Sequence, residues 1–427
     1  MSFDYLCGYP DKAAAMQAAA RFWNPDKVRF WEQSGVPLMI GRREGYLLYD
    51  LDGREVIDVH LNGGTYNLGH RHPELVAALR EAVQHVDIGN HHFPSPVRSA
   101  LAQALLATTG ANMRHVAFVS TGSEAIDLAI KSARYATGRR VIVSVRKAYH
   151  GHTGLAVATG DARFSQLFHS DRPDEFRAVP FNDVSAMEAA LSRGDVAAVI
   201  METIPATYGF PMPQPGYLEA VASLCARHGS LYVADEVQTG LMRTGCFWAI
   251  DRHALTPDIL VTAKGLGGGL YPVAALVMDA RSSGWLEQDG FAHMSTFGGS
   301  ELGCFVALRV IEMTRRVETR DCIARNIAFF HNGLARIQQR HPQWLTGIRQ
   351  AGLVIGLEFH APDGAVRVMH ALFERGVWAI FSTLDPRVLQ FKPGLLLDQA
   401  TGEAILDRLE AAVMATDPAM AHAGGRV

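Results

Sequence analysis

The stretches SLYVADEVQTG (residues 230–240) and DILVTAKGLGGGLYPVAA (residues 258–275) each begin with an apolar run that leads to reactive side chains. The first run ends in Asp235 and Glu236, and the second ends in Lys264, which is followed by glycines. Short apolar runs of this kind are typical of strands that are buried on both faces of a sheet. The two stretches therefore predict buried strands with reactive groups at their carboxyl ends.

Similar apolar runs lie on either side of these stretches and alternate with helical patterns. The runs occupy residues 115–120, 140–145, 196–203 and 272–278, and the helical patterns include residues 123–136 and 217–227. Strands that alternate with helices predict an α/β domain with a mainly parallel sheet. In open sheets of this class, ligands bind beyond the carboxyl ends of the strands, so we expect the chemistry there.

The two ends of the chain have a different pattern. Residues 13–23 predict a helix, and Asp52-Gly53 predicts the turn of a β-hairpin. After about residue 300 we expect a long helix that begins at residue 303, then short strands within 352–359 and a final helix over 401–414.

The composition argues against several classes of protein. The 427 residues include 40 basic and 43 acidic side chains, and the net charge of −3 favours neither nucleic acid nor an anionic membrane as a partner. The N-terminus lacks a signal-peptide pattern, and no apolar run reaches the about 20 residues that span a bilayer. Five scattered cysteines without a CxxC pair indicate neither disulfides nor a zinc site. We expect a soluble, cytoplasmic protein.

The segment HVAFVSTGSEAIDLAIKSAR (residues 115–134) predicts a strand, a tight turn and a helix. Gly122 allows close approach of the backbone, Ser123 offers a hydroxyl, and free N–H groups at the helix start would hold a phosphate. The same turn contains the capping pattern S/T-x-x-E, formed by Thr121 and Glu124. The segment alone is compatible with phosphate binding or with simple capping.

The strand-end residues also permit more than one interpretation. Asp235 or Glu236 could bind a metal, act as a base, pair with a cationic heterocycle or form an ordinary salt bridge. Lys264 could have a depressed pKa and form a Schiff base, or it could be a surface lysine before a flexible turn.

The segment KAYHGHTG (residues 147–154) follows another predicted strand. Tyr149 could lie flat against a planar ring. His150 and His152 have the spacing of a strand pair, but no acidic or cysteine residue is near them in the sequence, so a metal site is not indicated.

The order and spacing of these features are more specific than any one of them. With YDLDGREVIDVHLNGGTYNLGHRHPE, ADEVQTGLMRTG, TAKGLGGGLYPVAA and HMSTFGG, the series resembles the class III aminotransferases, which are fold type I pyridoxal-phosphate enzymes. The resemblance covers nearly the whole chain. It implies an α/β fold with a large domain over residues 61–302, a smaller α+β domain built from residues 1–60 and 303–427, and pyridoxal 5′-phosphate as cofactor.

The resemblance also implies catalytic and cofactor-binding roles for individual residues. Lys264 would hold the cofactor as a Schiff base and, once displaced by substrate, would move a proton at the substrate Cα. Asp235 would pair with the protonated pyridine nitrogen of the cofactor. Gly122 and Ser123 would bind its phosphate.

Five further positions match the family pattern at the cofactor. Tyr149 would stack on one face of the ring, and Val237 would pack on the other. Gln238 would lie near the ring hydroxyl, and Glu202 would support the region of Asp235. Thr296 resembles the threonine that reaches the phosphate of the neighbouring subunit, which implies a homodimer with shared sites.

The chain departs from the family pattern where substrate is bound. Thr203 and Thr207 lie in ETIPATYGF, where many relatives have EPxQGExG. Gln390 replaces the arginine of LRxxPPL that binds the substrate α-carboxylate, and Gly394 replaces the second proline. Glutamine cannot supply a bidentate positive charge, and Lys392 would supply only a point charge. The departures argue against the ordinary glutamate site.

Other residues could replace that arginine or line the substrate pocket. The candidates for a substrate carboxylate, each of which could also be an ordinary surface arginine, are Arg42, Arg43 and Arg387. The candidates for an aromatic pocket, each of which could also serve ordinary packing, are Tyr66, Phe93, Tyr208 and Phe210.

The leading functional hypothesis is an aminotransferase that moves an amino group between an amine or amino acid and an oxo acid or aldehyde. The alternative with the same cofactor is an aminomutase, racemase or lyase that acts on a single amino substrate. A non-catalytic cofactor-binding protein is a third hypothesis, but such a protein would need neither Lys264 nor Asp235.

Overall fold

The computed structural model describes residues 3–421, which form two compact units. The first unit contains the chain up to Leu61, the segment Leu68–His72 and the chain from Arg325 onward. The second contains Asn62–Asn67 and Pro73–Ala324. The domain limits expected from the sequence remain predictions.

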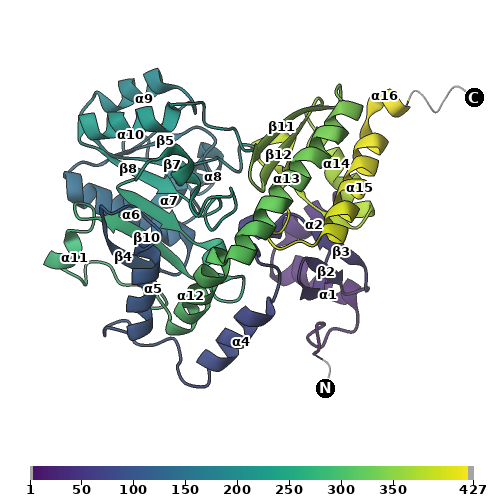
Figure 1. Ribbon diagram of the computed structural model, residues 1–427, viewed down its shortest axis with the longest axis horizontal. Helices are drawn as coiled ribbons and strands as arrows, with labels where there is room; N and C mark the ends of the chain where they lie inside the picture. The colour runs from purple at the N-terminus through teal and green to yellow at the C-terminus, as the bar shows by residue number, and fades with distance from the viewer. Residues whose placement is uncertain (1–2, 422–427) are drawn as a thin grey trace, which may run out of the picture. The chain divides into compact units, whose positions relative to one another are not determined.

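The second unit is built on a sheet of seven strands in the order β4-β10-β9-β8-β7-β5-β6 (Figure 1). The strands are β4 (Met113–Val119), β5 (Val141–Val145), β6 (Phe176–Val179), β7 (Val196–Glu202), β8 (Leu231–Asp235), β9 (Ile259–Thr262) and β10 (Ala274–Asp279). The pairs from β9 to β6 are parallel, and β10 is antiparallel to both β9 and β4. The mainly parallel sheet predicted from the sequence is confirmed.

The reversed direction of β10 follows from its short connection to β9. Residues 263–273 contain a 3-10 turn at Lys264–Gly267 and otherwise irregular chain. A parallel neighbour requires a crossover of about a dozen residues or more, usually a helix, so this connection returns antiparallel. The edge strand β6 was not predicted, because its four residues, FRAV, are too few to reveal a period.

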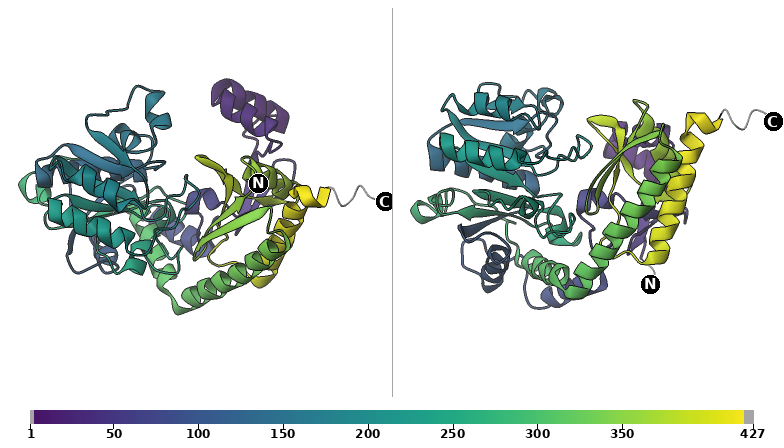
Figure 2. Two further views of the ribbon diagram at one scale, coloured as in Figure 1. Left: turned by 90° about the horizontal axis from the view of Figure 1, so that it is seen from above. Right: turned by 45° about the horizontal axis from the view of Figure 1, so that its top comes forward.

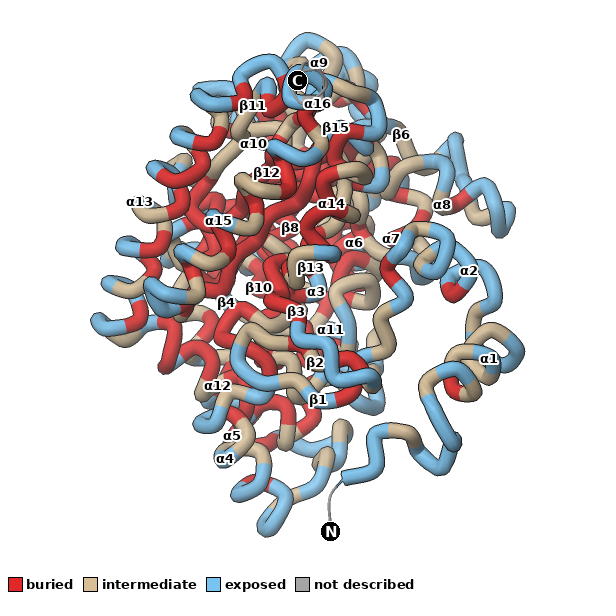
Figure 3. The backbone as a smooth tube through the Cα atoms, turned by 90° about the vertical axis from the view of Figure 1, so that its right-hand side faces the viewer, coloured by how far each residue is buried: buried red, intermediate tan, exposed pale blue. Residues whose placement is uncertain are grey.

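Helices cover both faces of this sheet. One apolar cluster joins it to α6 (Gly122–Thr137), α7 (Gly154–Thr159) and α11 (Trp285–Gln288). The opposite cluster joins it to α5 (Pro96–Leu106), α9 (Val184–Leu191), α10 (Tyr217–His228) and α12 (Glu301–Arg315). Along β8, Leu231 and Val233 belong to the first cluster, whereas Tyr232 and Ala234 belong to the second. Figure 3 shows these central strands as buried backbone.

The remaining short elements connect these layers. They are α3 (Leu61–Gly64), α4 (Pro73–Ala82), α8 (Ala162–Gln166) and the 3-10 helix Ala249–His253. None of the helices in residues 3–421 has the length and apolar character that crossing a membrane would require.

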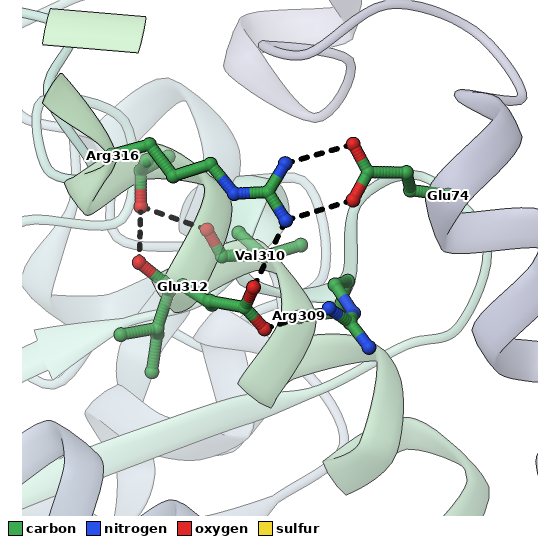
Figure 4. A network of polar contacts seen from close by, with 7 residues as sticks. Glu74, Arg309, Val310, Glu312 and Arg316 are labelled. Atoms are coloured by element: carbon green, nitrogen blue, oxygen red, sulfur yellow. Dashed lines mark hydrogen bonds and ion pairs between the residues drawn. The ribbon is translucent and has the colours of Figure 1, made fainter. Parts of the chain in front are cut away.

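The long helix expected after residue 303 is interrupted. α12 ends at Arg315 and α13 (Val317–Arg340) follows, because Arg316 between them has an extended ψ of 144°. The Arg316 guanidinium donates to both carboxylate oxygens of Glu74 at 2.8 Å and to Glu312 at 2.9 Å (Figure 4). These ion pairs tie the helix break to α4.

The first unit contains two four-stranded sheets. Their orders are β1-β2-β3-β13 and β11-β12-β15-β14. The strands are β1 (Ile40–Glu44), β2 (Leu47–Asp50), β3 (Glu55–Asp58), β11 (Leu345–Ala351), β12 (Val354–Phe359), β13 (Val377–Trp378), β14 (Ile380–Ser382) and β15 (Asp385–Phe391). The hairpin predicted at Asp52-Gly53 is confirmed, because β2 and β3 pair antiparallel around it.

Helices accompany these sheets in the first unit. They are α1 (Lys12–Phe22), α2 (Pro25–Gln33), α14 (Gly364–Glu374), α15 (Gln399–Thr416) and α16 (Pro418–Ala421), together with the later part of α13. α13 and α15 lie side by side (Figure 2), and a Cβ added to Gly333 would be 2.2 Å from Leu406 Cδ1. The helices expected from the sequence over residues 13–23 and 401–414 correspond to α1 and α15.

Candidate active site

A cavity of about 640 Å³ lies at the carboxyl edge of the sheet in the second unit. Its walls come from the segments that follow β4, β5, β7, β8 and β9, whose parallel carboxyl ends meet at one edge. It brings together most of the residues that the sequence had singled out. These are Gly122, Ser123, Tyr149, Glu202, Asp235, Val237, Gln238 and Lys264.

Lys264 begins the 3-10 turn after β9, and its side chain faces the cavity. Its backbone φ of +45° is left-handed, a strained conformation that a lysine adopts only when the surrounding structure holds it. A Cβ added to Gly63 would be 3.2 Å from Lys264 Cε, and the left-handed φ of +71° at this position favours glycine. Burial lowers the pKa of Lys264 against the opposing charges of Asp235 and Glu202. The neutral, nucleophilic amine is thereby favoured.

Asp235 is the last residue of β8, and both of its carboxylate oxygens accept hydrogen bonds. Oδ1 accepts from the Val237 N–H at 3.0 Å, and Oδ2 lies 2.7 Å from His150 Nδ1. Burial acts to lower the pKa of His150, but the hydrogen bond to Asp235 and the nearby carboxylates outweigh it and raise that pKa overall. The pair therefore presents an oriented carboxylate to the cavity.

Glu202 is the last residue of β7, which lies between β5 and β8 in the sheet. Its Oε1 accepts from the Tyr149 N–H at 3.0 Å, and its Oε2 accepts from the Ala206 N–H at 2.9 Å. Burial, with a smaller contribution from Asp235, raises the pKa of Glu202 to about 7. Glu202 thus fixes the backbone of Tyr149 beside the Asp235 carboxylate.

The turn between β4 and α6 has the helix cap that the sequence suggested. Thr121 accepts from the Glu124 N–H at 3.2 Å, and Glu124 Oε2 accepts from the Ser120 N–H at 2.8 Å. The capping interpretation is therefore confirmed. It does not compete with anion binding, because the N–H groups of Gly122 and Ser123 in the first turn have no acceptor within the helix.

A second hydroxyl lies beside Ser123 in the cavity wall. Thr153 Oγ1 donates to Asp127 Oδ2 at 2.8 Å and is 2.7 Å from Ser123 Oγ. Since the Thr153 proton is directed to Asp127, Ser123 is the donor in the contact between the two hydroxyls. No sequence pattern indicates a role for Thr153, because its position depends on the return of the chain from β5 to the start of α6.

The other predicted residues also contact or line the cavity. A Cβ added to Gly122 would be 3.2 Å from both Val237 methyl groups, so Gly122 permits close packing there. The side chains of Gln238 and Lys264 both lie within 4 Å of the position that a Cβ on Gly63 would occupy. Tyr149 lines the cavity as a neutral phenol, since burial raises its pKa.

Two further residues lie in surroundings of their own. Thr296 is exposed in the segment after β10 and does not line this cavity, so its role at the phosphate of a neighbouring subunit stays a prediction. His150, for which the sequence indicates no metal site, pairs with Asp235 across 85 residues of sequence. Within residues 3–421, no group of three or more His, Cys, Asp or Glu side chains is arranged to hold a metal ion.

Glu236, the neighbour of Asp235, is directed away from the cavity and has a structural environment. Its carboxylate accepts from the Thr203 and Thr239 hydroxyls, each at 2.6 Å. It also accepts from the backbone N–H groups of Ala249 and Ile250 at 3.0 and 2.8 Å. The family departure at Thr203 therefore provides a donor to this buried carboxylate.

The departures near the C-terminus lie in the first unit. Lys392 is fully buried, and its Nζ donates to Gln390 Oε1 at 2.6 Å. A Cβ added to Gly394 would be 2.0 Å from the ring of Tyr46, whose hydroxyl accepts from the Leu396 N–H at 2.9 Å. Tyr46 thus explains why glycine replaces the second proline.

The candidate arginines have partners within the first unit. Arg42 lies 3.7 Å from the centre of the Tyr49 ring, and Arg43 donates to the Gly41 carbonyl at 3.0 Å. Arg387 donates to both Asp385 oxygens, at 2.9 and 3.0 Å.

The candidate aromatic residues do not line the cavity either. Phe210 is fully buried, and Phe93 is exposed. Tyr208 lies under the Lys147 ammonium at 4.5 Å, and Tyr66 packs against Gly269. The role of these four residues in an aromatic substrate pocket therefore stays a prediction, with ordinary packing as the alternative.

Comparisons with known proteins agree with this geometry. Residues 31–413 match the family model of class III aminotransferases. A protein from Archaeoglobus fulgidus named "uncharacterized aminotransferase" is 39% identical over 95% of both chains. Among solved structures, the ornithine aminotransferase of Toxoplasma gondii has a TM-score of 0.87 at 26% identity over 96% of both chains. The N-acetylornithine aminotransferase of Stenotrophomonas maltophilia has a TM-score of 0.77 at 27% identity, over 91% of this chain and 98% of its own.

The fold is that of the fold type I pyridoxal-phosphate enzymes. The chain belongs to the class III aminotransferase family. It is therefore a transaminase that uses pyridoxal phosphate, a cofactor that a further structure of the T. gondii enzyme holds at partial occupancy in its active site. An aminomutase, racemase or lyase is not favoured.

The cavity fits this cofactor chemically. A lysine amine, a buried carboxylate and a helix N-terminus with two adjacent hydroxyls correspond to an aldehyde, a pyridine nitrogen and a phosphate. A Cβ added to Gly151 would be 2.2 Å from Ser123 Oγ, so glycine keeps the cradle open around that hydroxyl.

Proposed function

We propose that this transaminase uses Lys264 as its cofactor-binding and proton-transferring residue and Asp235 as the partner of the cofactor ring. The observation that carries the proposal is the placement of both side chains in one cavity, at the carboxyl ends of the adjacent strands β8 and β9. When bound, pyridoxal phosphate supplies an aldehyde that forms a Schiff base with an amine and a ring that withdraws electrons from the substrate Cα.

The N-terminus of α6, together with the hydroxyls of Ser123 and Thr153 beside it, would hold the phosphate. Gly122 and Ser123 offer backbone N–H groups at the positive end of the helix dipole, and Ser123 adds its hydroxyl. The Thr153 N–H donates to Ser123 Oγ at 3.0 Å, and the Ser123 proton would turn from Thr153 Oγ1 to the phosphate when that group binds.

Tyr149 and Val237 would hold the cofactor ring, and Gln238 would contact its hydroxyl. Asp235 would bind the ring nitrogen, and the hydrogen bond from His150 would keep the carboxylate oriented for that contact. Glu202 positions Tyr149 by accepting a hydrogen bond from the Tyr149 backbone N–H.

Lys264 Nζ would accept the proton of the substrate Cα and hold it for its return during the transfer of the amino group. A general base works best when its pKa is near the working pH, and burial shifts the Lys264 pKa in that direction. A change of this residue therefore removes both covalent binding and proton transfer.

The functional unit is a cytoplasmic homodimer in which Thr296 reaches the phosphate of the neighbouring site. Thr296 is exposed, and four large apolar side chains near it are more than half exposed: Phe93, Phe291, Met294 and Phe297. Arg98 joins their segments, since it donates to the carbonyls of Phe93 and Gly299 at 3.1 and 2.7 Å. Exposed apolar patches of this kind favour subunit contact. We expect Phe297→Asp to lower the mass measured by light scattering from the dimer to the monomer value.

Reduction of the holoenzyme with borohydride tests the assignment of Lys264. We expect the cofactor mass on the peptide that contains Lys264 and its loss in Lys264→Ala, whereas Lys131→Ala, which changes an exposed lysine of α6, keeps it. Lys264→Ala should have no measurable transamination. Labelling of a different lysine would refute the assignment.

A further inference from the structure

An aromatic cluster borders the cavity on the side of the segment after β5. The rings of Tyr149, His152 and Phe164 contact one another edge to face. Their centroids are 5.2 Å apart for Tyr149–His152, 5.7 Å for Tyr149–Phe164 and 5.0 Å for His152–Phe164. Tyr149 and His152 line the cavity, and Phe164 packs behind them from α8. Edge-to-face contacts at these distances are stabilising, so the cluster is a defined wall.

The wall is fixed to the sheet at its base. The Asp161 N–H donates to the Ala148 carbonyl at 2.9 Å, and the Asp161 side chain caps α8 by accepting from the Arg163 N–H at 3.1 Å. Phe164 is therefore held beside Tyr149 rather than carried on a free loop. A wall that is anchored in this way can select the shape of a bound group.

The electrostatic surroundings of the wall favour an uncharged group. Among the described residues that line the cavity there is no arginine, and Lys264 is the only lysine. Burial lowers the pKa of His152, so its imidazole is neutral at pH 7 and offers no charge to a carboxylate. The Arg163 guanidinium lies 5.6 Å from the centre of the Phe164 ring but does not line the cavity. A charged group packed against these rings would lose its hydration without an opposite charge among the three wall residues.

We propose that His152 and the edge of Tyr149, held in place by Phe164 behind them, form the subsite for the side chain of the amino substrate, and that this side chain is an uncharged aromatic ring. The inference rests on the proposed function, because that function places the reacting amine beside Lys264. The residues Leu270, Tyr271 and Pro272 supply further apolar lining of the same cavity.

Four primary amines that differ at the far end test the subsite. The holoenzyme is mixed with 2-phenylethylamine, n-butylamine, β-alanine or 1,4-diaminobutane, and the loss of the visible absorbance of the bound cofactor gives a second-order rate constant for each amine. We expect the constant for 2-phenylethylamine to exceed each of the others at least about tenfold. An equal or larger constant for β-alanine or the diamine would overturn the proposal.

Substitutions in the wall provide matched controls. His152→Phe keeps a neutral ring and should keep the preference, whereas His152→Arg should raise the constant for β-alanine about tenfold and lower that for 2-phenylethylamine. Phe164→Leu should reduce the preference for the ring about fivefold and leave the spectrum of the bound cofactor unchanged. Full retention of the preference in Phe164→Leu and His152→Arg would refute the role of the wall.

The two proposals fail in different ways. The proposed function fails if borohydride labels a lysine other than Lys264, whatever the amine preference. If none of the four amines changes the cofactor absorbance, the subsite is tested by calorimetry with the unreactive ligands phenylacetamide and propionamide. Tighter binding of phenylacetamide would support the aromatic subsite, and equal binding would overturn it.

Discussion

One buried histidine–aspartate pair lies at the cavity of the second unit, and another lies at the helix ends of the first unit. His150 Nδ1 is 2.7 Å from Asp235 Oδ2, and His341 Nδ1 is 2.8 Å from Asp417 Oδ2. None of the four side chains is more than 6% exposed. The two pairs have almost the same distance and burial, so their different tasks come from their surroundings.

The pair in the first unit joins two helix ends. His341 follows α13 and its N–H bonds to the Ile337 carbonyl at 3.1 Å, while Asp417 ends α15 and accepts from the Ala419 N–H at 3.0 Å. Nearby, Trp344 donates to the Thr416 hydroxyl at 3.1 Å. These contacts use backbone and neutral partners, which is typical of a structural pair.

The pair in the second unit opens onto a cavity with other ionisable groups. Asp235 lines the cavity together with Lys264 and Glu202, whose pKa values burial shifts toward neutrality. A buried histidine–aspartate pair is thus a sign of a reactive site only where other titratable groups share its cavity.

The largest effect expected in this comparison is on the rate after Asp235→Asn. The neutral amide keeps the shape but cannot stabilise a protonated pyridine nitrogen, so we expect kcat to fall about 1,000-fold. The matched control is Glu236→Gln, because Glu236 is equally buried next along the chain but does not line the cavity. Its kcat should stay within about threefold of wild type while the melting temperature falls. Similar rates for the two variants would remove the distinction between these carboxylates.

The pair in the first unit should respond in the opposite way. His341→Ala leaves the Asp417 carboxylate buried without its ring partner, and such a loss costs about 3 kcal/mol. We expect a lower midpoint in urea with kcat unchanged. A drop in kcat at temperatures where the variant is fully folded would contradict a purely structural role.

The titration of Glu202 provides a test of the cavity environment through the pH dependence of stability. The pKa of Glu202 is raised from 4.5 to about 7 in the folded protein, so the folded state binds its proton more tightly than the unfolded state does. Its contribution is fully present below about pH 4.5 and is lost as the pH rises through about 7. Glu202→Gln removes this dependence, and we expect its stability relative to wild type to improve between pH 5 and pH 8 by about 2 kcal/mol. Melting curves of both proteins across this range provide the measurement, and parallel curves would disprove the raised pKa.

The smallest effect on stability is expected at the ion pairs of Arg316, which belong to neither histidine–aspartate pair. Arg316 binds Glu74 and Glu312, but the side chains of all three residues are more than a third exposed, at 35%, 43% and 53% respectively. Solvent screens such pairs, so Arg316→Gln should lower the free energy of unfolding by at most about 1 kcal/mol. The shift should diminish further in 1 M salt. A loss as large as that of His341→Ala would show that exposure does not separate these ion pairs.

The strands and the reactive residues at their ends could be predicted from the sequence, because both are defined by neighbouring residues. The apolar runs before Asp235 and Lys264 indicated buried strands, and the turn at Gly122 and Ser123 indicated a helix start. Periodicity and turn chemistry depend on neighbouring residues, so these elements could be predicted without the fold.

Features that depend on the order of strands in space were not predictable. β7 lies between β5 and β8, so the residues after β5 reach Glu202 and Asp235. His150 therefore binds a carboxylate that is 85 residues away, and no sequence pattern reports that contact. The same limit explains why Thr153 and Phe164 were missed.

Local pattern thus determined which residue types stand at the ends of the strands, and family resemblance related them to a cofactor. Family resemblance also assigned Asp235, rather than the adjacent Glu236, to that cofactor. The tertiary structure alone decided which aromatic residues join Tyr149 in the cavity wall and which histidine–aspartate pair joins a reactive group. The physical reason is that burial and pKa depend on atoms brought together through space, and these come from segments far apart in the chain.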